Sequence, residues 1–469
     1  MPSPAVKSYF FGKGYKDLRD TIAEAWQRTL LSSRDSFRRC GEAAEDEWPQ
    51  KLLLAFWLAS GLSIFVFGLA VTAVLSLIHI LILGVVFLVI YLAFMVVRGM
   101  EQAVLLVRRF IFVCPSCHAR LPLPVYLCDG CGAAHPRLIP SEFGIMRHRC
   151  RCGRPLPATV LLNRGRLKSK CPECGALLAR EHMEAKKHFI PIVGGPSVGK
   201  SVYMFELCRK MRETVSLGPS MTWRFLDANT ERLYNQVISR MDSGQPPDKT
   251  SAVLPRAFDL LLEGAGQRQA LYLYDPAGEA FLDAANLTAH KFLGYPSGIV
   301  FIIDPFSLQA VREQYRTQLA GTPGLRPSTA SIEDTLTRLI NVLEAQFGLG
   351  ARDRVKAPIA VVINKVDAFD LDTQIGEAAV QKAAAQPDES VEQRRNRVIR
   401  ASLIKWGQAN FVQRVEGRFT TVAYFSVSAL GRSPDRMTRA FEPRNVLDPA
   451  LWILRHCDQS WQRAASGRP

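Results

Sequence analysis

Hydrophobic and polar residues divide this chain into three segments with different spacing. Residues 1–51 form a charged N-terminal arm, and apolar residues at helical intervals predict a possible amphipathic helix over Asp17–Phe37. From Leu52 to Val97 the chain contains no Asp, Glu, Lys or Arg. Later, apolar runs of strand length alternate with helical patterns, which predicts a doubly wound α/β domain over residues 186–469.

The uncharged segment is long enough to cross a bilayer twice. One crossing takes about 20 apolar residues, so its 46 residues predict a hairpin of two transmembrane helices over 52–98. The helices would cover about 52–75 and 80–98 and turn near Ser76–His79. The flanks carry positive charge and the turn carries none, so both termini of an integral membrane protein are expected on the cytoplasmic side. The flanking residues are Lys51, Arg98, Arg108 and Arg109.

Cysteines are concentrated between the hairpin and the α/β domain, in residues 110–185. Eight of the 11 lie there in close pairs, a spacing typical of zinc sites, and the region resembles tandem zinc ribbons. Pairing neighbours along the chain predicts two Zn²⁺ sites, with His148 as an alternative ligand in the second. A redox pair or an iron–sulfur cluster is the alternative to zinc. The predicted ligand sets are Cys114, Cys117, Cys128 and Cys131, then Cys150, Cys152, Cys171 and Cys174.

The net charge indicates what this region would bind. The chain carries +16, and residues 98–188 supply most of it with 16 Lys and Arg against 6 Asp and Glu. The membrane segment is close in sequence, which favours anionic lipid headgroups as the ligand. Nucleic acid is the alternative, although few aromatic residues are present for base stacking. The basic residues of the second ribbon are Arg147, Arg149, Arg151, Arg154, Arg164, Arg166, Lys168 and Lys170.

A glycine-rich sequence follows the first strand of the α/β domain. Gly194–Ser201 has the form Gly-x-x-x-x-Gly-Lys-Ser, in which backbone N–H groups surround a phosphate chain. Lys200 would reach the terminal phosphates, and the Ser201 hydroxyl would ligate Mg²⁺. The residues expected to bind nucleotide here are Gly194, Gly195, Ser197, Val198, Gly199, Lys200, Ser201 and Val202.

A second polar sequence stands at the end of the strand pattern over residues 270–275. Asp275 ends this strand, and Gly278 follows three residues later. An aspartate in this position can hold Mg²⁺ through water, and the glycine N–H can approach a γ-phosphate. The pattern Asp-x-x-Gly is common in turns, so it indicates a nucleotide site only together with the phosphate loop.

Two more sequences address the base of the nucleotide. Asn364, Lys365 and Asp367 come directly after the strand pattern over residues 359–363. A carboxylate can accept two hydrogen bonds from the N1–H and 2-amino group of guanine, and adenine offers no such pair of donors. After the last strand pattern, a backbone N–H of Ser428 or Ala429 could meet the guanine O6. These residues predict a site that selects guanine.

The four sequences, in this order, resemble those of the TRAFAC class of P-loop GTPases, which includes Ras-like and translation-factor-like proteins. More loosely, the chain looks like bacterial membrane-linked proteins of the double-GTPase type. The resemblance covers about residues 186–460 and implies GTP and Mg²⁺ as ligands and hydrolysis to GDP and phosphate. It also implies a place in the bacterial inner membrane and a protein effector or partner GTPase. The matching sequences are Gly194–Ser201, Asp275–Gly278, Asn364–Asp367 and Ser428–Leu430.

The resemblance assigns further roles. A switch I threonine that ligates Mg²⁺ is expected before the second strand; Thr250 is the candidate and Thr230 the alternative. Glu279 stands where Ras-like enzymes have a glutamine that orients the attacking water, which implies slow or partner-dependent hydrolysis. The switches are expected at 240–252 and 276–290. The implied catalytic residues are Lys200, Thr250, Gly278 and Glu279.

The expected function is that of a membrane-anchored regulatory GTPase. One alternative is a GTP-binding assembly scaffold that scarcely hydrolyses GTP, which the Glu279 substitution keeps open. The other alternative is a nucleic-acid sensor that uses the basic ribbons and in which GTP only controls binding. Single-turnover hydrolysis separates the first alternative from a GTPase, and the salt dependence of nucleic-acid binding tests the second.

Overall fold

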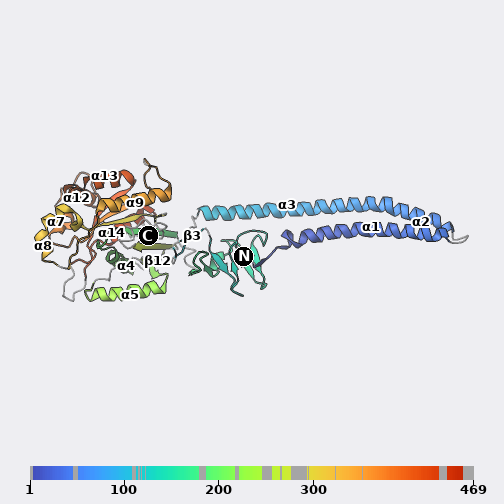
Figure 1. The fold of residues 1–469 in the computed structure, drawn as a ribbon, viewed down its shortest axis with the longest axis horizontal. Coiled ribbons are helices and arrows are strands. Elements are labelled where there is room, and N and C mark those ends of the chain that lie inside the picture. The colour runs from blue at the N-terminus through green and yellow to red at the C-terminus, as the bar shows by residue number, and fades with distance from the viewer. Residues whose placement is uncertain are drawn as a thin grey trace. The chain divides into compact units, whose positions relative to one another are not determined.

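In the computed structural model the chain forms two compact units (Figure 1). The N-terminal unit contains residues 1–112 and 121–180, and the C-terminal unit contains residues 113–120 and 181–469. Each unit is described by itself. The structure describes residues 4–45, 51–107, 112–114, 117, 119–121, 123–178, 186–216, 221–245, 256–264, 267–275, 293, 295–322, 324–350, 352–432 and 441–457.

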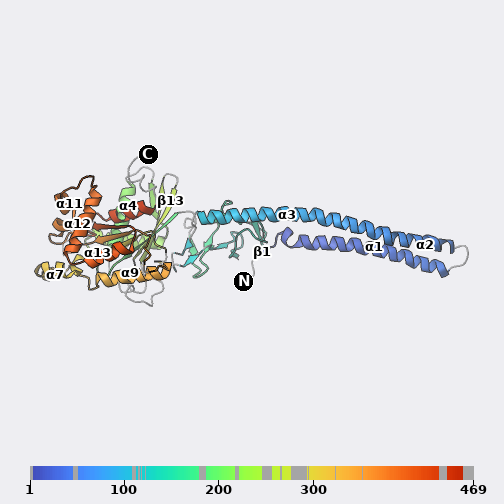
Figure 2. The same cartoon turned by 90° about the horizontal axis from the view of Figure 1, so that it is seen from above.

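Two long helical segments form the first part of the N-terminal unit. The strand β1 (Ala5–Val6) and the turn η1 (Tyr9–Phe11) precede helix α1 (Lys13–Glu45). The second segment, here called the apolar helix, runs without interruption through α2 (Lys51–Ser63), η2 (Ile64–Gly68) and α3 (Leu69–Val107). Both views show α1 lying alongside it (Figure 2).

Hydrogen bonds between polar side chains join α1 to the apolar helix. The indole N–H of Trp26 donates to the Ser76 hydroxyl over 3.1 Å, and the hydroxyls of Thr29 and Thr72 lie 2.8 Å apart. The exposed face of α1 carries i,i+3 and i,i+4 ion pairs such as Arg28–Glu24. This helix is therefore amphipathic, with its less charged side against the apolar helix.

The predicted turn near Ser76–His79 is not found, because both residues lie inside α3. No glycine or proline stands between Leu69 and Leu83, so nothing in this part of the sequence interrupts the helical hydrogen bonds. Over Leu53–Val104 the apolar helix is long and apolar enough to cross a membrane, judged by length and composition only. Two crossings and the orientation of the termini remain predictions.

Short strands form the rest of the N-terminal unit. They make a three-stranded sheet in the order β1-β6-β7 and a four-stranded sheet in the order β5-β4-β8-β9. A further pair, β2-β3, borders residues 113–120, which belong to the C-terminal unit. The chain start belongs to this region, because β1 pairs with β6. The strands are β2 (Phe112–Val113), β3 (Arg120–Leu121), β4 (Val125–Leu127), β5 (Ala134–His135), β6 (Arg147–Cys150), β7 (Pro155–Pro157), β8 (Ser169–Lys170) and β9 (Leu177–Leu178), with the 3-10 turn η3 (Arg164–Arg166).

A buried ion pair joins the end of α3 to these strands. The guanidinium of Arg164 lies 2.8 Å from the Glu101 carboxylate, and the two side chains are only 1% and 3% exposed. Arg164 also donates to the Tyr126 hydroxyl and to two backbone carbonyls, while the N–H of Val160 donates to Glu101. Because every charge finds several partners, this pair can be buried without leaving an unpaired ion.

A seven-stranded mixed sheet forms the centre of the C-terminal unit, in the order β11-β12-β13-β10-β14-β15-β16. The strands from β13 to β16 in this order are parallel, and β11 and β12 add antiparallel neighbours at one edge. The prediction of an α/β domain is confirmed. The strands are β10 (Lys186–Val193), β11 (Met221–Phe225), β12 (Arg256–Gly264), β13 (Gln267–Asp275), β14 (Ile299–Ile303), β15 (Ile359–Ile363) and β16 (Val422–Ser426).

Helices cover both faces of this sheet. Along β14, Val300 and Ile302 pack into one hydrophobic core with α4, α5 and α14. The alternate residues Ile299, Phe301 and Ile303 pack into a second core with α9, α10, α12 and α13. This two-sided burial explains why the strands are almost wholly apolar. The helices are α4 (Lys200–Ser216), α5 (Ala228–Asp242), α7 (Gln309–Gln314), α8 (Arg316–Ala320), α9 (Ile332–Phe347), α10 (Leu371–Ile375), α11 (Glu377–Lys382), α12 (Val391–Lys405), α13 (Ala409–Arg418) and α14 (Leu447–Cys457), with η5 (Pro305–Ser307).

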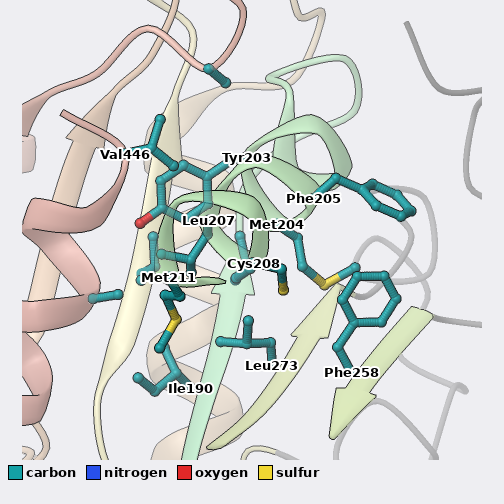
Figure 3. Packing of buried hydrophobic residues seen from close by; sticks show 14 of the residues in the cluster. Ile190, Tyr203, Met204, Phe205, Leu207, Cys208, Met211, Phe258, Leu273 and Val446 are labelled. Carbon is teal, nitrogen blue, oxygen red and sulfur yellow. The ribbon is translucent and has the colours of Figure 1, made fainter. Parts of the chain in front are cut away.

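Helix α4 is anchored in the first of these cores. Figure 3 shows Met204, Cys208 and Met211 from α4 beside Ile190 of β10 and Leu273 of β13. All of these side chains are buried. The packing fixes the start of α4 relative to β10, and the phosphate-loop sequence connects these two elements.

Candidate functional site

The phosphate-loop sequence forms a tight turn between β10 and α4. Ser197 and Gly199 have positive φ angles of 61° and 93°. A side chain at Gly199 would place its Cβ 2.5 Å from the amide nitrogen of Asn364, and one at Gly194 would come within 2.6 Å of the Ile302 carbonyl oxygen. Glycine is therefore required at both positions by the close approach of neighbouring groups.

Lys200 is folded back onto this loop. Its Nζ donates to the carbonyl oxygens of Gly194 over 3.0 Å and Gly195 over 2.8 Å. Burial lowers the pKa of Lys200, and the nearby carboxylate of Asp275 acts in the opposite direction. A lysine that is buried in this way holds its ammonium at the loop, where phosphate oxygens could take the place of the carbonyls.

Ser201 and Asp275 lie in contact, as a magnesium site requires. The Ser201 hydroxyl donates to Oδ2 of Asp275 over 2.5 Å. Asp275 ends β13, which is parallel to β10, so both side chains stand at the carboxyl edge of the sheet. A hydroxyl and a carboxylate are oxygen ligands of the kind that Mg²⁺ prefers. These two residues could hold the ion directly or through water.

Asn364 connects the phosphate loop to the loop after β16. Its amide nitrogen donates to the Val198 carbonyl over 2.9 Å, and its amide oxygen accepts from the Ala429 N–H over 3.1 Å. The side chain is buried. A single amide group therefore connects the sequence Asn364–Asp367 and the sequence Ser428–Leu430 to the phosphate loop.

Lys365 makes a second connection. Its Nζ donates to the carbonyl oxygens of Ser197 and Arg326, each over 3.0 Å, and to the Asp304 carboxylate over 2.7 Å. The backbone of Lys365 has a positive φ of 60°. The hydrogen bond to Ser197 brings its side chain to the phosphate loop, where the sequence predicts the nucleotide.

The carboxylate of Asp367 lies beside the loop after β16. The Ser428 hydroxyl donates to Oδ1 of Asp367 and accepts from the N–H of Gly431 over 2.7 Å. The predicted base-recognition residues therefore come together at one end of the sheet. Their role in selecting guanine remains a prediction.

Two groups near the site were not predicted from the sequence. Asp304 is completely buried and accepts hydrogen bonds from Lys365 and from the N–H groups of Phe306 and Ser328. Asp304 directly follows the apolar run of β14, just as Asp275 stands at the end of the apolar run of β13. The sequence feature that predicted Asp275 could therefore also have indicated Asp304. The second group is the segment 325–331, whose sequence carries no recognisable motif.

Several predicted residues lie outside the described part of the chain. They are Thr250, Gly278 and Glu279, all of the switch II range 276–290, and the end of the switch I range 240–252. The alternative residue Thr230 is described, and it lies in the first turn of α5. Its N–H and hydroxyl both donate to the capping carboxylate of Asp227, so its side chain serves the helix start.

The cysteines form two groups of four, but they do not pair with their neighbours along the chain. In each group the sulfur atoms lie within 4.8 Å of one another. The predicted ligand sets are therefore wrong, although the two predicted sites are both present as cysteine groups. The groups are Cys114, Cys117, Cys171 and Cys174, and Cys128, Cys131, Cys150 and Cys152.

The geometry of the second group fits zinc. The Cys128–Cys152 and Cys131–Cys150 sulfur distances are both 3.6 Å. A tetrahedral ion with Zn–S bonds of about 2.3 Å separates its sulfurs by about 3.8 Å. The alternative ligand His148 instead directs Nε2 toward the Ser141 hydroxyl at 3.2 Å. Four cysteines could thus hold the metal without histidine.

Glycines shape the turns that carry these ligands. Gly132, Gly153 and Gly175 have positive φ angles of 70°, 88° and 75°. The N–H of each donates to the carbonyl of a cysteine three or four residues earlier, as Gly175 does to Cys171 over 3.0 Å. All three turns thus end in a glycine with positive φ, and the turn at Cys150 is one residue shorter because its pair has only one residue between its cysteines. Arg164, predicted as part of the basic surface, is buried with Glu101 instead.

Comparison with known proteins gives one result for the C-terminal unit. A family model described as Double-GTPase 2 matches residues 188–427, just over half of the chain. The match includes Gly194–Ser201, Asp275–Gly278 and Asn364–Asp367, and it ends directly before Ser428. A search of curated proteins found no match to the chain.

Proposed function

This chain belongs to the Double-GTPase 2 family of P-loop GTPases, and from this premise we propose that it is a membrane-anchored GTP-dependent switch. GTP binding as such follows from the family. The finer proposal concerns base selection, the rate of hydrolysis and the membrane. Base selection is supported most strongly by the contact of Asn364 with both Val198 and Ala429, because that contact brings the phosphate and base motifs into one site.

In the proposed site, each residue has a separate task. Lys200 would neutralise charge on the β- and γ-phosphates, and Ser201, Thr250 and Asp275 would hold Mg²⁺. The ion, when bound, stabilises negative charge on the phosphate oxygens. Gly278 would sense the γ-phosphate through its N–H. The loss or presence of that phosphate would then change the switch segments, which a partner protein reads.

Hydrolysis is proposed to be slow unless another group assists it. Glu279 stands at the position that orients the attacking water in Ras-like enzymes. Its carboxylate could accept a hydrogen bond from water, but the triphosphate repels its negative charge. We therefore expect a lower rate than a glutamine would give at this position.

Replacing Asp367 by asparagine tests the selection of guanine. The amide can no longer accept two hydrogen bonds from N1–H and the 2-amino group, whereas it can donate to the 2-oxygen of xanthine. We expect GTP affinity to fall by about 10²-fold and XTP affinity to rise, because hydrogen bonds to charged groups contribute roughly 1.5–3 kcal/mol each. Equilibrium titration with both nucleotides measures this exchange. An unchanged preference for GTP over XTP would contradict the assignment.

Anchoring is proposed to come from the apolar helix. Its 46 uncharged residues would extend about 69 Å at 1.5 Å per residue. The hydrocarbon core of a bilayer is about 30 Å thick, so this length suits two crossings better than one. We propose that in a bilayer the segment 52–98 crosses twice, turns near Ser76–His79, and leaves both termini on the cytoplasmic face of a bacterial inner membrane.

A cysteine in place of His79 tests this topology. In the two-crossing arrangement, position 79 faces the outside, and a membrane-impermeant maleimide added to spheroplasts should label it. The unsubstituted chain gives the background from its own cysteines. Labelling only after detergent is added would place position 79 within the membrane or on the cytoplasmic side, and either position would contradict the proposed turn.

A further inference from the structure

The segment Leu325–Ser331 lies directly against the phosphate loop. A Cβ on Gly195 would come within 2.9 Å of both the Ser328 hydroxyl oxygen and the Ala330 Cβ. The Ser328 N–H donates to the buried Asp304 carboxylate over 2.9 Å. The segment therefore forms one wall of the loop that is proposed to hold the phosphates.

Arg326 is held beside this loop by its backbone. Its carbonyl oxygen accepts from Lys365 Nζ over 3.0 Å, and the same ammonium donates to the Ser197 carbonyl over 3.0 Å. Because both carbonyl oxygens lie 3.0 Å from the same nitrogen, they are at most about 6 Å apart. Ser197 is a residue of the phosphate loop, so the Arg326 backbone is a near neighbour of the expected phosphate chain.

The side chain of Arg326 is exposed while the residues around it are fixed. Leu325 is 8% exposed and Ser328 only 1%, and both pack into the body of the unit. In the described part of the chain, no hydrogen bond or ion pair engages the guanidinium of Arg326. A fixed backbone with an uncommitted cationic side chain is suited to bind an anion, because little ordering of the chain is needed.

We propose that Arg326 is an arginine supplied by this chain itself to the phosphates of GTP. This inference rests on the proposed function. In the reaction, water adds to the γ-phosphorus while the bond to the β–γ bridging oxygen breaks. The bond electrons stay on that oxygen in GDP, and the water protons pass to phosphate and solvent. The guanidinium would donate hydrogen bonds to the oxygens on which this charge collects.

The proposal offers a reason for a GTPase with glutamate at position 279. Arginine fingers raise the rate of GTP hydrolysis by about 10³–10⁵-fold in GTPases that receive them. An arginine within the chain would compensate for weak orientation of the water. Lysine would not replace it well, because an ammonium lacks the planar fork of donors that can span two phosphate oxygens.

Single-turnover hydrolysis by the full chain in lipid nanodiscs tests the role of Arg326. We expect Arg326→Ala to lower the rate constant by about 10²-fold or more while GTP affinity changes less than about tenfold. Arg326→Lys should recover only a small part of the rate. Arg352→Ala is the matched control, since this exposed arginine precedes β15 at the opposite edge of the sheet. It should hydrolyse GTP at the parent rate.

A second measurement is independent of the rate. GDP with aluminium fluoride mimics the transferred phosphoryl group, and the parent and Arg352→Ala should bind it while Arg326→Ala should not. Equal hydrolysis and equal aluminium fluoride binding by parent and Arg326→Ala would overturn the proposal but leave the GTPase assignment intact. A parent that binds GTP and never hydrolyses it alone would also overturn it. A parent that binds no GTP would overturn the proposed function as well.

Discussion

A chain that carries both Cys128→Ser and Cys150→Ser is expected to keep one zinc ion and lose the other. The two cysteines belong to the same group in the structure, so the double substitution leaves Cys114, Cys117, Cys171 and Cys174 complete. Pairing of neighbours along the sequence would instead damage both sites. Elemental analysis of the purified chain gives the ratio of zinc to protein. The ribbon strands are short, so losing an ion should unfold the turns around it; structural zinc contributes about 10–16 kcal/mol in zinc-finger peptides.

The reciprocal pair sharpens this test. Cys114→Ser with Cys128→Ser removes one ligand from each observed group and should abolish both zinc sites. Neighbour pairing would leave one site complete in that chain. Cys40→Ser is the control that should retain both ions, because Cys40 lies in α1 and belongs to neither group. One zinc in the reciprocal variant and none in the first would contradict the observed pairing.

Replacing Lys200 by alanine is expected to have the largest effect on the nucleotide site. The ammonium is buried at the loop, and its two hydrogen bonds to Gly194 and Gly195 show that it reaches the loop interior. Loss of a charged partner to the phosphates should weaken GTP binding by about 10²-fold, from roughly 1.5–3 kcal/mol for each charge-assisted bond. Hydrolysis should fall below detection. Fluorescence titration with a labelled GTP analogue and phosphate release measure the two effects.

Lys210 offers a matched control on the same helix. It pairs with Glu213 on the exposed side of α4, so Lys210→Ala should bind and hydrolyse GTP as the parent does. Thermal unfolding of both variants separates loss of binding from loss of structure. Parent-like affinity in a folded Lys200→Ala chain would exclude Lys200 from phosphate binding.

The sequence was sufficient to predict the parts of the site that follow strands. Asp275, Asn364 and Ser428 each come directly after a buried apolar run, and parallel strands bring such ends together at one edge. Asp304 carries the same signal, but a lone aspartate after a strand is common and no known motif includes it. Its importance depends on contacts with Lys365 and Ser328 that only the folded chain provides.

The zinc ligand sets could not be predicted because spacing does not determine which pairs meet. β4 pairs with β8 in antiparallel register, with Val125 opposite Lys170, so Cys128 and Cys171 follow opposite ends of this pair and contribute to different groups. The strand pairing decides this, and the spacing of the cysteines along the chain does not reveal it. In the same way, Arg326 could not be identified, since its place beside Ser197 depends on the Lys365 side chain.

The predicted turn near Ser76–His79 differs from the structure for another reason. Bilayer thickness led to the prediction of a turn, whereas the helix in the structure continues because the local sequence has no helix-breaking residue. Local propensity therefore favours a continuous helix, whereas the proposed double crossing requires a turn in the same segment. Labelling at position 79 decides which conformation a bilayer selects.

Equilibrium titration of the full chain with GTP and with ATP, each with Mg²⁺, tests most directly whether this site binds guanine nucleotides. We expect saturable binding of one GTP per chain and an affinity for ATP lower by about 10²-fold or more, because adenine cannot supply the donors that the Asp367 carboxylate accepts. Equal affinity for the two nucleotides, or no binding of GTP, would contradict the assignment.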